Sequence, residues 1–243
     1  MTFLFDLIFY KPVLNFLVFL YNHLPAHDFG LSIIILTVVI KLVLYPLSQH
    51  TIKSQKELQE LQPKLEELKT KFKDNKEEQA KATMALYREH KINPFSSCLP
   101  LIIQLPFLFA VFKVFRTFGQ TMDTSMLYSF TNVPEFSNGL KLFNYIDLSK
   151  PNVVLAVLAG GAQFWQTKMM MTKKPAIKTP DSQDENMASI MNKQMMYMMP
   201  IITIVIGVSL PGGLTLYWFV FSILSALQQL YVFKQKNKAE ALS

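Results

Sequence analysis

Apolar runs recur along the chain, and polar segments of very different length separate them. A helix needs ~20 predominantly apolar residues to cross a bilayer, and five of the runs approach that length. The pattern therefore predicts an all-α polytopic membrane protein with a bundle of five transmembrane helices. We expect the five spans at residues 29–49, 94–118, 151–170, 194–208 and 213–233.

The longest polar segment, residues 50–93, has the pattern of a helical hairpin in water. Leucines recur in its first half at spacings of three and four, which places them on one helical face. Asp74 and Asn75 interrupt this pattern, and Asn75 with Glu78 three positions later is typical of a helix N-cap. We predict a second helix whose Ala80, Met84 and Tyr87 face the first. The leucine stripe consists of Leu58, Leu61, Leu65 and Leu68.

The apolar stretch 3–24 is interrupted by charged and amide side chains. Lys11 and Asn15 lie four positions apart and therefore share one helical face. We predict an amphipathic helix that lies in the membrane interface and is bent or begun at Pro12. An uncleaved signal anchor is the alternative, because the stretch is long enough to span. The interface is favoured because a span would bury Asp6, Lys11 and Asn15 in hydrocarbon.

Basic residues gather in three of the connecting segments. Residues 50–93, 168–193 and 234–243 hold ten, five and three Lys or Arg, together 18 of the 24 in the chain. By the positive-inside rule these segments are cytoplasmic. The net charge of +7 then reflects topology and attraction to anionic lipids, and no nucleic-acid partner is needed to explain it. The other predicted segments are the N-terminal helix 1–28, the extracytoplasmic segment 119–150, the cytoplasmic loop 171–193, the extracytoplasmic turn 209–212 and the basic cytoplasmic tail 234–243.

One lysine, Lys41, lies well inside the first predicted span. A lysine near the centre of a spanning helix costs ~2.5–3.5 kcal/mol on insertion scales. Its flexible stem could carry the ammonium to the interface near Ser48. Alternatively, the charge faces a wet cavity lined by protein. We expect a polar cavity that reaches the cytoplasmic side, because the five predicted spans contain no Asp or Glu to neutralise the charge.

The sequence lacks the motifs of several enzyme classes. It has no GxxxxGK[ST] or GxGxxG stretch for nucleotide binding, and its single cysteine, Cys98, excludes an intramolecular disulfide and a multi-cysteine metal site. His23 and His27 are four apart, but Pro25 disrupts the helix that would align them as metal ligands. Ser209 lacks the GxSxG context of a serine nucleophile. We therefore expect no catalytic residues, no cofactor and no metal, in a protein that is not an enzyme.

Four motifs, in their order and spacing, resemble the YidC/Oxa/Alb family of membrane protein insertases over nearly the whole chain. They are GLSIIILTVVIKLVLYPL, LQPKLEELK, MALYREHKINPFSSCLPLIIQLPF and LPGGLTLYWFVFSILSALQQ. The resemblance implies a core of five helices, an amphipathic helix before it and a hairpin on the cytoplasmic side. It also implies that the chain inserts transmembrane helices and assists their folding, alone or beside the Sec translocon.

In that family a positive residue of the first core helix lies in a hydrophilic groove, and Lys41 occupies its place here. Bacterial relatives usually have arginine there, and lysine differs because it can lose its proton when desolvated. By their residue types alone, the other polar side chains of the spans make ordinary interhelical hydrogen bonds or anchors. The resemblance favours Gln104 and Trp218 as groove residues. The predicted client-binding groove consists of Lys41, Gln104, Gln163, Gln166 and Trp218.

The resemblance implies hydrophobic client membrane proteins and membrane lipids as partners of a monomer in the bacterial plasma (inner) membrane. The Sec translocon and the ribosome are further candidate partners, although three tail lysines argue against a strong ribosome dock. We expect neither a large extracytoplasmic domain nor a long basic tail. A small channel or transporter with Lys41 as an anion site is an alternative, as is a structural scaffold. The absence of acidic partners and of an internal repeat counts against the transporter.

Overall fold

The computed structural model describes residues 2–93, 99–118, 124–134, 139–169 and 196–240. Cys98 and the predicted loop 171–193 lie outside the described residues. The described part is almost entirely helical, as predicted. Its elements are α1 (Thr2–Phe5), the π-helical turn η1 (Asp6–Tyr10), α2 (Lys11–His23), η2 (Pro25–His27), α3 (Phe29–Val43), α4 (Tyr45–Lys71), α5 (Lys76–Glu89), α6 (Leu99–Phe118), η4 (Thr124–Met126), β1 (Lys141–Leu142), β2 (Ile146–Asp147), α7 (Val153–Met169), the helix Met196–Gly207 and α9 (Gly212–Glu240).

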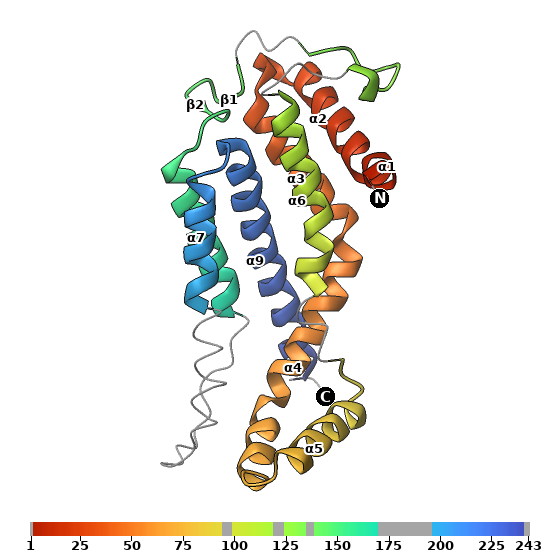
Figure 1. Ribbon diagram of the computed structural model, residues 1–243, viewed down its shortest axis with the longest axis vertical. Coiled ribbons are helices and arrows are strands. Elements are labelled where there is room, and N and C mark those ends of the chain that lie inside the picture. Colours follow the sequence, from red (N-terminus) through yellow and green to blue (C-terminus); the bar gives the residue numbers. More distant parts are fainter. Residues whose placement is uncertain (1, 94–98, 119–123, 135–138, 170–195, 241–243) are drawn as a thin grey trace.

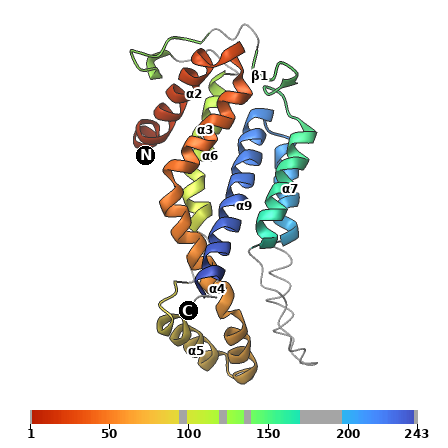
Figure 2. The same cartoon turned by 180° about the vertical axis from the view of Figure 1, so that it is seen from behind.

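The long helix α9 lies at the centre of the bundle (Figure 1 and Figure 2), where α3, α4, α6 and α7 all contact it. Its side chains enter the hydrophobic core together with those of α2, α3 and α6. Leu14, Ile33 and Tyr217 of this core are fully buried. The core therefore holds one end of α9 against three helices that are distant from it in the sequence.

Two helical stretches, Phe3–His23 and Gly212–Gln235, are long and apolar enough to cross a membrane by length and composition. A third comes from α3 and α4 if this bent pair is one span. The helix Met196–Gly207 is apolar but shorter, and α7 has 17 residues. The described residues are thus mostly helical with two or three candidate spans, which is consistent with an all-α membrane protein, and the predicted number of five spans stays a prediction.

The first predicted span, 29–49, is broken at Leu44. The helices α3 and α4 meet there, and they are bent by 67° relative to each other. Pro46 lies in the first turn of α4 and has no amide hydrogen to continue the hydrogen-bond ladder of α3. Beyond the bend, α4 continues without interruption through the buried residues Thr51 and Ile52. The break therefore lies inside the predicted span, and no break separates that span from the hairpin predicted to begin at residue 50.

The first turns of α4 pack against the C-terminal part of α9. Lys56 is buried in this contact, with 8% of its surface exposed. Its ammonium lies 5.6 Å from the centre of the Phe233 ring and 3.7 Å from the Glu60 carboxylate. An ammonium over an aromatic face is attracted by the ring quadrupole. Lys56 therefore ties the base of α4 to α9.

Beyond this base, α5 folds back against α4 (Figure 1). Leu61 and Leu65 of the predicted stripe are buried. The Asn75 side chain caps α5 by accepting a hydrogen bond of 3.2 Å from the amide three residues later, as predicted. Met84 is 51% exposed and Ala80 is exposed as well, so the prediction that these two face α4 was wrong. Tyr87, the third residue predicted there, is partly buried, and this burial raises the pKa of its hydroxyl.

The N-terminal helix lies alongside α6 and is joined to it by polar side chains. Asp6 pairs with Lys113 at 2.5 Å, and the hydroxyls of Tyr10 and Thr117 are hydrogen-bonded at 2.9 Å. Tyr10 follows Asp6 by four residues, and its partner Thr117 follows Lys113 by four residues. The two helices therefore run in the same direction here. The π-helical turn η1 directly precedes Pro12. The predicted bend is therefore a wider turn that accommodates the missing amide hydrogen of Pro12.

This pairing changes one argument made from the sequence. The charge on Asp6 is matched by Lys113, and the Asn15 carboxamide accepts a hydrogen bond of 2.6 Å from the amide of Tyr128. The ammonium of Lys11 lies 5.1 Å from the centre of the Tyr128 ring. Polar groups of this helix are therefore satisfied by protein, and their charge alone does not exclude a position within the membrane.

Reversing the charge of Asp6 is expected to destabilise the fold. Asp6→Lys places two ammonium groups together and should lower the free energy of unfolding by ~1 kcal/mol. The swapped pair, Asp6→Lys with Lys113→Asp, should recover most of this loss. The measurement is thermal unfolding in detergent. Glu77→Lys is the control, because the side chains of the Glu77–Lys81 pair are 78% and 73% exposed. Loss of this pair should change the free energy of unfolding by no more than about 0.5 kcal/mol. A swapped variant as unstable as Asp6→Lys would contradict the prediction.

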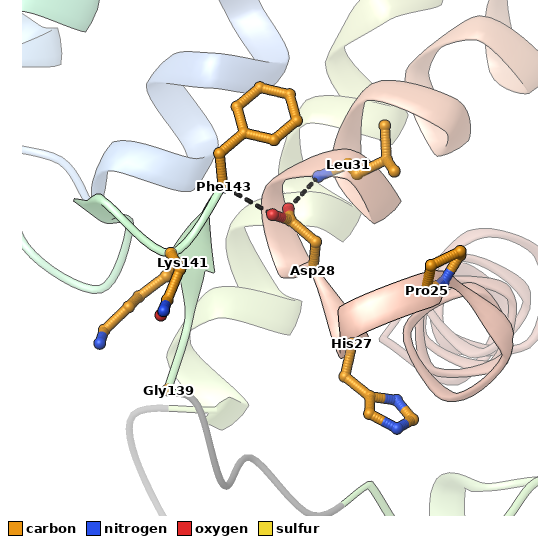
Figure 3. A pocket seen from close by; sticks show the side chains of 8 residues that line it. Pro25, His27, Asp28, Leu31, Gly139, Lys141 and Phe143 are labelled. Atoms are coloured by element: carbon orange, nitrogen blue, oxygen red, sulfur yellow. Dashed lines mark hydrogen bonds between the residues drawn. The ribbon is translucent and has the colours of Figure 1, made fainter.

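A short antiparallel hairpin of β1 and β2 rests on the start of α3. One carboxylate oxygen of Asp28 accepts a hydrogen bond of 2.7 Å from the Leu31 amide, and the other accepts one of 2.5 Å from the Phe143 amide (Figure 3). Gly30 permits this close approach, since a Cβ atom there would overlap Leu142. A cavity of about 310 Å³ lies beside this contact. It is lined by Pro25, His27, Asp28, Leu31, Gly139, Lys141, Phe143 and Asn144.

Candidate functional site

Lys41 lies in the last turn of α3, ~18 Å along the helix axis from Phe29 at 1.5 Å per residue. Its ammonium donates a hydrogen bond of 2.9 Å to the Ser225 hydroxyl of α9. The same ammonium lies 4.6 Å from the centre of the Phe221 ring. The Lys41 side chain therefore points across the bundle to α9. The wet cavity predicted around it stays a prediction.

One side of α9 presents the groups that meet Lys41. Tyr217, Phe221 and Ser225 are spaced by four residues, so they lie in a row along the helix. The Tyr217 hydroxyl accepts a hydrogen bond of 2.6 Å from the Gln104 side chain of α6. The rings of Tyr217 and Phe221 are 6.1 Å apart between centres. We call this row the Lys41 face of α9, and it joins two predicted site residues from two helices.

The Lys41 ammonium and the Gln104 carbonyl oxygen, which both lie at the Lys41 face, use only part of their hydrogen-bonding capacity among the described residues. The Ser225 hydroxyl donates to the Phe221 carbonyl at 2.8 Å and accepts from Lys41. A lysine ammonium has three donors, and no Asp or Glu in the described ranges forms an ion pair with Lys41. The Gln104 carbonyl oxygen is buried, with no hydrogen-bond partner among the described residues. Such an acceptor costs ~1–3 kcal/mol when left unpaired.

A second polar contact joins α9 to the bend between α3 and α4. The Gln228 amide donates to the Ser48 hydroxyl at 2.8 Å and lies 3.4 Å from the Tyr45 carbonyl oxygen. The Ser48 hydroxyl also lies 3.0 Å from that carbonyl. Gln228 follows Ser225 by three positions, nearly one helical turn. Polar contacts of α9 therefore continue from Lys41 to the first turn of α4.

The other predicted site residues lie elsewhere. The Gln163 side chain of α7 accepts a hydrogen bond from the Thr203 hydroxyl of the neighbouring helix Met196–Gly207. Gln166 and Trp218 are half-buried, and no contact within the described ranges joins either of them to Lys41. The places of these three residues in a client-binding groove stay predictions.

The sequence reasoning did not select Ser225, Phe221 or Tyr217. A single serine within an apolar helix is common as a packing residue, and nothing local distinguishes Ser225 from Ser222. The available signal was the four-residue spacing of Tyr217, Phe221 and Ser225 in LYWFVFSILSALQQ. That spacing becomes informative only once α3 is known to pack on this side of α9.

The sequence of this chain matches one protein family along most of its length. The family described as 60Kd inner membrane protein matches residues 19–240. The chain belongs to the 60Kd inner membrane protein family. Over 228 residues it is 38% identical to the membrane protein insertase YidC of Fusobacterium nucleatum, which covers 93% of this chain and 97% of that relative.

Two further relatives are longer than this chain. The chain is 37% identical over 226 residues to the membrane protein insertase YidC of Syntrophus aciditrophicus, covering 92% of this chain and 36% of the relative. It is 33% identical over 233 residues to the protein of the same name from Geobacter metallireducens, covering 95% of this chain and 38% of the relative. The chain thus spans somewhat more than a third of these two relatives.

Membership in the 60Kd inner membrane protein family confirms the resemblance found in the sequence motifs. The family description and the apolar helices of the structure agree that this is a membrane protein. The three relatives are named as insertases, which agrees with the expectation that the chain is not an enzyme.

Proposed function

We propose that this chain is a membrane protein insertase. It inserts transmembrane helices of hydrophobic client proteins into the bilayer and assists their folding, alone or beside the Sec translocon. The observation that carries the proposal is the match to an insertase of F. nucleatum over 93% of this chain and 97% of that relative. The Lys41 ammonium within the bundle supports it, because a positive charge next to apolar helices suits a client with both polar and apolar parts.

The physical problem for an insertase is to carry the polar tail of a client past a hydrocarbon core ~30 Å thick. A polar groove that begins at the cytoplasmic side shortens the apolar path. The Lys41 ammonium then attracts acidic residues of the tail, and the Gln104 side chain lines the groove. A close pair of opposite charges is worth ~4 kcal/mol at an effective dielectric constant of 20. That strength holds a segment briefly and still lets it leave.

The proposed topology keeps the five spans predicted from the sequence, with the α4–α5 hairpin and the C-terminus in the cytoplasm. The distribution of Lys and Arg supports this orientation. The segment that contains β1 and β2 then lies outside, next to the start of α3 and α9. Lys41 is near the cytoplasmic end of α3 in this arrangement, as a groove that opens to that side requires.

We further propose that residues 3–24 stay on the outer side and do not cross the membrane. Asp6 pairs with Lys113, which lies five residues before the end of α6, or ~7.5 Å at 1.5 Å per residue. The helical residues before Asp6 add only ~6 Å. Because this helix runs in the same direction as α6, Thr2 reaches a depth of ~14 Å, less than half of the hydrocarbon core. Figure 1 shows the helix running obliquely to α9, which shortens this depth further.

Labelling of single cysteines tests this topology. In a background without Cys98, a cysteine at Thr2 is expected to react with a membrane-impermeant thiol reagent in intact cells. Tyr145→Cys, at a side chain that is 92% exposed, is the reference for the outer side, and Asn75→Cys is the reference for the cytoplasm. If Thr2→Cys reacts only after lysis, like Asn75→Cys, then residues 3–24 form a sixth span.

Reconstitution in liposomes tests the function itself. The purified protein should insert a single-span client with a short acidic tail, scored by protection of the tail from added protease. A second client with Gln in place of the acidic residues measures the electrostatic part. Flux of a small anion without client insertion would instead support a channel or transporter. The absence of both activities, in a protein that binds other membrane proteins, would support a scaffold.

A further inference from the structure

The contact between Lys41 and Ser225 is more specific than a half-buried lysine requires. Ser225 is 4% exposed and its hydroxyl is oriented by the hydrogen bond that it donates to the Phe221 carbonyl. The lone pairs of that oxygen therefore face Lys41, whose ammonium is 2.9 Å away. The Phe221 ring flanks the ammonium at 4.6 Å on the same helix. Two residues one helical turn apart thus define where the charge lies.

The lysine stem alone would not define this position. It has four rotatable carbon bonds, and its ammonium is a compact charge without directional preference. Nearer the bend, Gln228 of α9 and Ser48 of α4 carry further hydrogen-bond acceptors, and the two side chains are hydrogen-bonded to each other. Without the Ser225 hydroxyl, the ammonium loses the hydrogen bond that holds it at this level of the bundle. The Ser225 hydroxyl therefore decides which level of the bundle carries the positive charge.

We propose that Ser225 is a positioning residue that sets the specificity for clients with acidic tails. It holds one of the three ammonium donors of Lys41 and, with the Phe221 ring on one side, directs the remaining donors toward a client carboxylate. Ser225 acts through Lys41 and does not itself contact the client. This inference rests on the proposed insertase function and adds to it the residue that fixes the attracting charge.

The test uses two substitutions of equal shape. Ser225→Thr and Ser225→Val both add bulk, but only threonine keeps the hydroxyl. In liposomes containing the full chain, Ser225→Val should lower the initial insertion rate of the acidic-tailed client about tenfold, the effect of losing a hydrogen bond to a charged group. Ser225→Thr should stay within about threefold of the wild type. The Gln-tailed client should be inserted at similar rates by both variants.

Two further variants separate positioning from packing. Ser222→Ala is the matched control, because Ser222 is also buried in α9, at 2% exposed, and has no described contact with Lys41. It should not change the preference between the two clients. A double-mutant cycle then asks whether Ser225 acts through Lys41: in a Lys41→Ala background, Ser225→Val should have no further effect on the acidic-tailed client.

The outcomes distinguish this inference from the proposed function. Equal losses for both clients in Ser225→Val, or an additive loss in the Lys41→Ala background, would overturn the positioning role while leaving the insertase intact. Equal rates for Ser225→Val and Ser225→Thr with the acidic-tailed client would overturn it as well. A wild-type protein that inserts neither client would overturn the proposed function, and the inference with it.

Discussion

Replacing Lys41 with alanine is expected to lower the insertion rate of an acidic-tailed client by about 100-fold, somewhat less than the full ~4 kcal/mol of a close ion pair. The reason is that no other cation among the described residues meets the Lys41 face of α9. Lys41→Arg should keep most of the activity, because the guanidinium is also positive and donates hydrogen bonds. The measurement is the initial rate of insertion into liposomes, read as protease protection.

The Gln-tailed client is the control for this experiment. Its insertion should change much less, because it has no carboxylate for Lys41 to attract. Equal rates for the wild type, Lys41→Ala and Lys41→Arg with the acidic-tailed client would remove the electrostatic role of Lys41. The family membership would be untouched by that result, since it rests on the whole sequence.

A side chain at Gly213 is expected to destabilise the bundle. A Cβ atom there would overlap the ring of Phe115 and approach Ile33 to 3.0 Å. Phe115 is 4% exposed and Ile33 is fully buried, so neither has room to move away. Overpacking of this kind costs ~1–3 kcal/mol. Gly213→Ala should therefore lower the melting temperature in detergent by about 3–10 °C.

Two variants make this prediction specific. Gly161→Ala in α7 is the matched control, because no atom lies within 4 Å of its added Cβ and alanine favours a helix by up to ~1 kcal/mol. Phe115→Leu should partly rescue Gly213→Ala by making room for the new methyl group. A Gly213→Ala protein as stable as the wild type would show that α9 can shift away from α6 without loss.

Features encoded by neighbouring residues were predictable from the sequence. Lys41 is conspicuous because one charge interrupts a long apolar run, and its cost in hydrocarbon demands an explanation. The cap at Asn75 and the buried leucines Leu61 and Leu65 follow from local spacing in a helix. Each of these signals is contained within a few turns of one helix.

Features that depend on packing between distant segments were not predictable in this way. Asp6 and Lys113 are 107 positions apart, and nothing in either segment identifies the other as its partner. The break at Leu44 lies in the apolar run that contains Lys41, where Pro46 alone is compatible with a continuous span, a kink or an end. Ser225 became a site residue only because α3 lies against that side of α9. One sequence contains no direct record of such pairings.

The packing of α4 against α9 has a mechanical consequence. Because α4 is held at its base by Gln228 and by the contact of Lys56 with Phe233, the part of α4 that projects beyond this base begins after Lys56. This projecting part of α4 extends to Lys71, ~22 Å at 1.5 Å per residue. Its base contacts α9, the helix that also carries Ser225. We therefore expect that a force applied to the tip of the hairpin by a docked protein is transmitted to α9, whose Ser225 is hydrogen-bonded to Lys41.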